Sequence, residues 1–109
     1  GNELFKEGKY PLAIKEYDEG LRRDPKAVAI YSNRCATLIK LVEFVPALKD
    51  ADKCIEIDPK FVKAYARKGT CHHFMKEYHK ALKSFDDGLK IEPGNKDCKD
   101  GKNKTMTAI

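Results

Sequence analysis

The chain has 109 residues, of which 36% are charged with both signs mixed, and its formal net charge is +5 at pH 7. This length suits one domain, residues 1–109, and no apolar run approaches the ~20 residues that span a bilayer, so we predict no membrane partner. The positive balance favours an acidic partner over a basic one.

An internal repeat organises the chain from its start to about residue 95. Pro25, Pro59 and Pro93 are 34 residues apart, and an acidic residue precedes each of them. Other sets recur in the same register: Ala13, Ala47 and Ala81; Tyr10, Phe44 and Tyr78; Gly20, Cys54 and Gly88; Leu21, Ile55 and Leu89. A fixed period of this length predicts a solenoid of stacked helix pairs.

Aligned on the prolines, the chain divides into a truncated repeat 1 (1–27), repeat 2 (28–61), repeat 3 (62–95) and a capping helix at about 96–108. Each repeat reads as two antiparallel helices. In repeat 2 the apolar spacing predicts helices over 27–41 and 44–57 with a short turn between them. Asn95 can cap the last helix, which we expect to shield the end of repeat 3 rather than to carry a function of its own.

Four cysteines and three histidines raise the question of a metal site. The chain has no CxxC pair, and Cys35 and Cys54 occupy positions where the sibling repeats have small residues, so we expect them to be packing residues. The run Cys71-His72-His73 cannot converge on one ion, because successive side chains on a helix point about 100° apart. We therefore predict no metal and no cofactor, and we expect His72 to belong to the core. Reduced cysteines fit a cytoplasmic protein.

No catalytic arrangement is visible: the chain has no Ser-His-Asp set, no paired acids and no glycine-rich phosphate loop, so we predict that it is not an enzyme. Nucleic-acid binding is disfavoured as well. The lysines that follow residue 95 are interrupted by Asp97 and Asp100, and no aromatic platform accompanies them.

Four polar residues depart from the repeat pattern: Asn2, Asn33, Lys63 and Arg67. From one repeat to the next, their position moves back by about one helical turn, so all four can line one groove formed by the first helices. Two amides and two cations suit an anionic oxygen ligand. A peptide ending in aspartate presents two carboxylates in a small volume and would fit this set.

The 34-residue pattern resembles the tetratricopeptide repeat over about residues 1–93. This resemblance implies an all-α, right-handed α-solenoid of three helix-turn-helix repeats with a C-terminal capping helix. Gly1-Asn2, Tyr31-Ser32-Asn33-Arg34 and the segment 63–68 resemble the dicarboxylate clamp of co-chaperone tetratricopeptide domains. Those domains hold the Glu-Glu-Val-Asp tail of cytosolic heat shock proteins 70 and 90.

Residues 41–67 are most similar to the C-terminal clamp domain of Hop-type organising co-chaperones. The resemblance implies C-terminal peptides of heat shock proteins 70 and 90 as partners, with the 70 tail favoured or both bound. Phe5, Ala36 and Ile39 follow the two asparagines at helical spacing and are candidates for an apolar pocket that takes the valine of the ligand. The family's clamp also has a fifth member, a lysine at a position before Gly1.

Two alternatives remain open at this point. The repeats can form a scaffold that binds another protein partner, with the four polar residues merely solvated. The domain can also be the targeting module of a phosphatase or a prolyl isomerase, because clamp-bearing repeats of this type occur joined to such domains.

Overall fold

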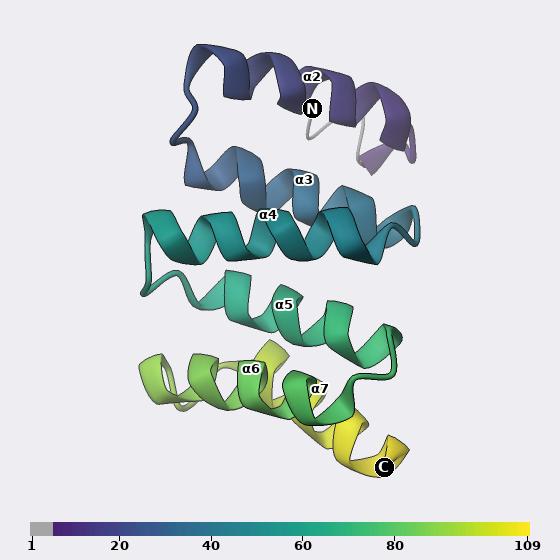
Figure 1. Cartoon of the computed structure of the whole chain (residues 1–109), viewed down its shortest axis with the longest axis vertical. Helices are drawn as coiled ribbons and strands as arrows, with labels where there is room; N and C mark the ends of the chain where they lie inside the picture. Colours follow the sequence, from purple (N-terminus) through teal and green to yellow (C-terminus); the bar gives the residue numbers. More distant parts are fainter. Residues whose placement is uncertain (1–5) are drawn as a thin grey trace.

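The computed structural model describes residues 6–109, and this part of the chain forms six helices and no strand. The helices are α2 (Tyr10–Arg23), α3 (Val28–Lys40), α4 (Phe44–Ile57), α5 (Val62–Phe74), α6 (Tyr78–Ile91) and α7 (Lys96–Ala108). They stack one after another along the longest axis of a molecule that measures 38 × 25 × 21 Å (Figure 1). The predicted all-α solenoid of helix pairs is confirmed.

The helices predicted in the middle of the chain differ from the observed ones by at most one residue at each end. Ala27 and Leu41, which we expected inside the first helix, are the N-cap and C-cap of α3. The turn into α4 then places Val42 at φ 61°, and Glu43 N–H donates to Leu38 O at 2.8 Å. Gly8 at φ 76° and Lys76 at φ 63° occupy the same point of the period, so one left-handed residue lies in the turn before each of α2, α4 and α6.

Small side chains form much of the core and let the helix axes approach closely. One buried cluster contains Cys35, Ala47, Ala51 and Cys71, and a second contains Ala66, Ala81, Phe85 and Cys98. All four cysteines are fully buried free thiols, and the packing role expected for Cys35 and Cys54 is confirmed. Burial raises the pKa of the Cys54 thiol to about 11.

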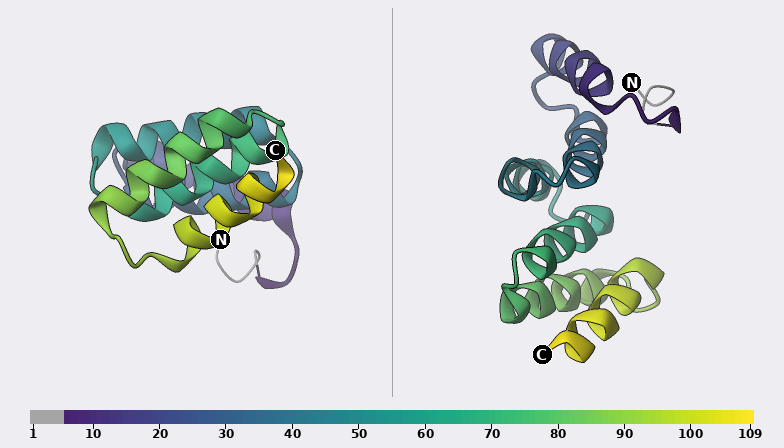
Figure 2. Two further views of the ribbon diagram at one scale, coloured as in Figure 1. Left: turned by 90° about the horizontal axis from the view of Figure 1, so that it is seen from below. Right: turned by 90° about the vertical axis from the view of Figure 1, so that its right-hand side faces the viewer.

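Helix α7 lies across α5 and α6 at the C-terminal end of the stack (Figure 2). Asn95 caps it as expected, because its Oδ1 accepts from Cys98 N–H at 2.9 Å. Gly101 lets α7 approach closely: a Cβ at that position would lie 2.4 Å from the ring of Phe85, which is itself 1% exposed. Phe85 is therefore clamped beneath α7, and the position of α7 depends on this contact.

Arg34 ties the first three described helices together. Its Nε and Nη2 donate to the two carboxylate oxygens of Asp50 in α4 at 2.9 and 2.7 Å, and its Nη1 donates to Asp18 in α2 at 2.8 Å. The hydrogen bonds to Asp50 are the main cause that raises the pKa of Arg34, against the opposing effect of burial. A bidentate pair of this kind fixes orientation as well as distance, so it sets how α3 is rotated about its own axis.

Candidate functional site

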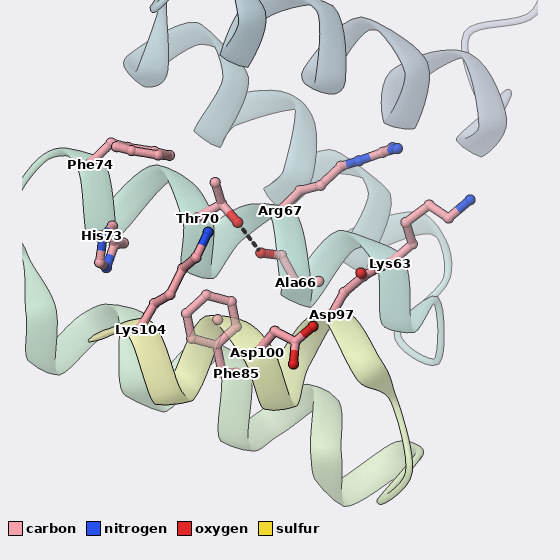
Figure 3. A pocket seen from close by; sticks show the side chains of 11 residues that line it. Lys63, Ala66, Arg67, Thr70, His73, Phe74, Phe85, Asp97, Asp100 and Lys104 are labelled. Atoms are coloured by element: carbon pink, nitrogen blue, oxygen red, sulfur yellow. Dashed lines mark hydrogen bonds between the residues drawn. The ribbon is translucent and has the colours of Figure 1, made fainter. Parts of the chain in front are cut away.

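A groove of about 750 Å³ opens between α5 and α7 (Figure 3). Its volume falls within the range of ligand-binding pockets. One wall comes from α5, the other from α7, and Phe85 of α6 closes the floor. Its lining residues are Lys63, Ala66, Arg67, Thr70, His73, Phe74, Phe85, Asp97, Asp100, Gly101 and Lys104.

Two cations, Lys63 and Arg67, stand one helical turn apart on the face of α5 that lines this groove. Lys63 is exposed, whereas Arg67 is half-buried. Arg67 Nη1 donates to the main-chain oxygen of Ser32 at 2.6 Å and also to the Ser32 hydroxyl. Burial lowers the pKa of Arg67, and the nearby Asp97 carboxylate acts in the opposite direction. An arginine stays charged under such an influence, so this end of the groove can bind an anionic oxygen.

The wall contributed by α7 is charged too, and sequence reasoning missed it. Asp97, Asp100 and Lys104 are exposed residues of α7 that line the groove. Within residues 6–109, no ion pair is recorded for these three side chains or for Lys63. Besides shielding the end of the stack, α7 therefore gives the groove two carboxylates and a further cation. The spacing 97, 100, 104 was the available signal, because these three residues fall on one face of a helix.

The far end of the groove is aromatic. Phe74 is 56% exposed and stacks on Phe44 with ring centroids 5.3 Å apart. His73 Nδ1 lies 2.9 Å from Thr105 Oγ1 of α7. His72 is buried, as expected, and its Nδ1 lies 3.0 Å from Glu77 Oε1. Among residues 6–109 no group of three or more His, Cys, Asp or Glu side chains is arranged to hold a metal ion.

The other predicted site residues divide into two groups. Asn33, Ala36 and Ile39 are half-buried on α3 and do not belong to the lining of the groove. Ile39 packs against the first core cluster, while Asn33 follows directly after Ser32, the residue that holds Arg67. Asn2 and Phe5 lie outside the described residues. The structure thus brings Lys63 and Arg67 together, and the apolar pocket remains a prediction.

The length and hydropathy of the helices show whether any of them could span a membrane. None of those within residues 6–109 is long and apolar enough to cross a bilayer.

Two family models match the chain: one described as TPR repeat covers residues 1–41, and one described as tetratricopeptide repeat covers residues 51–83. Among curated proteins, the chain is 54% identical over 44 residues to stress-induced-phosphoprotein 1 of Caenorhabditis elegans, which is 40% of this chain and 14% of that protein. It is 58% identical over 41 residues to the Hsp70-Hsp90 organizing protein of Triticum aestivum, 38% of this chain and 7% of that protein. The matches thus span only a small part of these relatives.

Solved structures match over nearly the whole chain. The TPR2B domain of yeast Sti1, solved in a complex with an Hsp70 peptide, is 36% identical with a TM-score of 0.92, covering 100% of this chain and 92% of that one. The first TPR of Spaghetti (RPAP3), bound to the HSP90 peptide SRMEEVD, is 30% identical with a TM-score of 0.94, covering 99% and 86%. The second TPR domain of human RPAP3, in complex with the HSP70 peptide SGPTIEEVD, is 35% identical with a TM-score of 0.92, covering 97% and 88%. The chain belongs to the tetratricopeptide-repeat family.

Proposed function

We propose that this domain is the protein-interaction module of a co-chaperone and that it binds the C-terminal Glu-Glu-Val-Asp tail of heat shock protein 70, heat shock protein 90 or both. Asn2, Asn33, Lys63 and Arg67 would form the carboxylate clamp. The role is binding without a catalytic step. Because the tails belong to cytosolic chaperones, the proposal implies a cytoplasmic location.

The observation that carries this proposal is the pair Lys63 and Arg67 in the groove. Both cations face a cavity large enough for a peptide, and neither forms an ion pair with another described residue. Cations that form no ion pair with a carboxylate among residues 6–109 leave their charge available to an anionic ligand. Charge-assisted hydrogen bonds to a carboxylate contribute roughly 1.5–3 kcal/mol each.

The comparisons support the same ligand class. Three similar domains of known structure were solved with Hsp70 or Hsp90 peptides, and the two peptides whose sequences are given, SRMEEVD and SGPTIEEVD, both end in Glu-Glu-Val-Asp. Their upstream residues differ, since the first has an arginine and the second has none. Matched titrations with these two peptides would therefore report which tail is preferred.

The test is calorimetric titration of the domain with both peptides, repeated with Lys63→Ala and Arg67→Ala. We expect binding in the micromolar range, about −8 kcal/mol, and a loss of about tenfold or more in each variant. Lys83→Ala is the matched control, because this exposed lysine of α6 lies outside the groove. Retention of binding in both groove variants would contradict the clamp. No binding by the folded wild-type domain would leave a scaffold for another protein partner.

A further inference from the structure

Among residues 6–109, one residue of the preceding repeat, Ser32, holds Arg67 in place. Its Nη1 donates both to Ser32 O, at 2.6 Å, and to Ser32 Oγ. Ser32 is 3% exposed, and no other hydrogen bond of the Arg67 guanidinium is recorded within residues 6–109. We propose that Ser32 is the positioning residue of Arg67 and determines which edge of the guanidinium meets the ligand. The inference rests on the proposed function, in which Arg67 binds a carboxylate.

The bonds to Ser32 matter because they decide which N–H groups of the Arg67 guanidinium remain for a ligand. Arginine has five N–H donors in a rigid plane, two on Nη1, two on Nη2 and one on Nε. The Ser32 carbonyl and hydroxyl together take both donors of Nη1. The edge formed by Nε and Nη2 remains, and it offers two parallel N–H groups, the geometry that a carboxylate accepts in a bidentate pair. Ser32 thus leaves Arg67 with one carboxylate-binding edge.

Fixing this side chain in advance has a second effect. An unrestrained arginine has about 2 kcal/mol of rotamer entropy to lose on binding, and restraint before the ligand arrives reduces that cost. A carboxylate of the protein itself could compete with the ligand for Arg67. Asp97 lines the same groove, and its negative charge opposes the burial that lowers the pKa of Arg67. In the structure Nη1 is bound to Ser32, and among residues 6–109 no ion pair joins the guanidinium to this carboxylate.

The rotation of α3 keeps Ser32 directed toward α5. Residues two apart on a helix point about 200° apart, so Ser32 and Arg34 project from nearly opposite faces of α3. Arg34 is tied on its side by Asp18 and Asp50 at 2.7–2.9 Å. These pairs hold the helix in the orientation that presents Ser32 to Arg67. The half-buried network of Arg34 therefore supports the groove from the opposite side of the helix.

The experiment compares Ser32→Ala with Ser84→Ala. Both serines are buried, at 3% and 4% exposure, but Ser84 Oγ donates only to Lys80 O within its own helix. Calorimetry with the peptide SRMEEVD should show binding about three- to tenfold weaker for Ser32→Ala and unchanged for Ser84→Ala. In an Arg67→Ala background, Ser32→Ala should cause no further loss, because its effect acts through the guanidinium.

A second measurement does not need the ligand. The 15N resonance of Arg67 Nε in the free domain should shift in Ser32→Ala and stay in place in Ser84→Ala. Wild-type affinity in Ser32→Ala, an undiminished effect in the Arg67→Ala background, or an unmoved Nε resonance would each overturn the assignment of Ser32. Failure of the wild-type domain to bind the peptide would instead refute the proposed function, and the resonance would still decide the role of Ser32.

Discussion

The turn between α3 and α4 contains a residue whose backbone conformation does not suit it. Val42 lies at φ 61°, in the left-handed region, where a β-branched side chain is a strong outlier. The same position of the preceding repeat is Gly8. We predict that Val42→Gly stabilises the domain, because removal of the Cβ relieves the left-handed strain.

The size of the gain follows from three contributions. Left-handed backbone costs an ordinary residue roughly 1–2 kcal/mol, and glycine returns about 0.5–1 kcal/mol through the greater freedom of the unfolded chain. The lost side chain is 69% exposed, so little apolar burial disappears with it. The net gain is about 0.5–1 kcal/mol, which in a domain of this size raises Tm by about 2–8 °C.

Thermal and urea unfolding of the wild-type domain, Val42→Gly and Val42→Ala would test this reasoning. Alanine removes the same exposed methyl groups and keeps the Cβ, so Val42→Ala should gain much less than Val42→Gly. Lys76→Gly should also stabilise the domain, although by less, because lysine is not β-branched. A Tm for Val42→Gly at or below the wild-type value, or equal gains for glycine and alanine, would refute the argument.

Three further outcomes are expected. Arg34→Ala should destabilise the domain by about 3 kcal/mol in urea unfolding, because Asp50, with a 6% exposed side chain, is left without its partner; an unchanged midpoint would contradict this. The double variant Asp97→Asn, Asp100→Asn should bind acidic C-terminal peptides about two- to fourfold more tightly in low salt. Each substitution removes a charge repulsion of about 0.4 kcal/mol at ~10 Å in water. Weaker binding would show that these carboxylates accept hydrogen bonds from the ligand. Peptide affinity should fall as ionic strength rises, because the contacts are electrostatic, and titrations at low and high salt that agree would argue against a clamp.

Much of the fold was predictable because the information is local and repeated. The spacing of prolines, small residues and aromatics marks helix ends and packing faces in each copy, so the bounds of α4 and the cap of α7 at Asn95 follow from short segments. The shared face of Lys63 and Arg67 is also local, because residues four apart lie together on any helix. These inferences required no knowledge of what packs against what.

The α7 wall of the groove was not predictable in the same way. Asp97, Asp100 and Lys104 read as solvated positions in the sequence, and they reach the groove only because Gly101 lets α7 settle on Phe85. The partner of Arg67 was hidden for the same reason, since Ser32 lies 35 residues earlier in the chain. Such contacts depend on the rotation and crossing of packed helices, which side-chain volumes throughout the core determine together.

The sequence by itself thus determined the repeat, the helix bounds to within a residue in repeat 2, the family and the cation pair of α5. The tertiary structure alone decided that α7 adds two carboxylates to the groove and that Ser32 orients Arg67. The physical reason is the distance along the chain between the residues involved. The residue pattern that predicts a helix lies within one or two helical turns, whereas the groove forms between helices that meet only when the whole stack is packed.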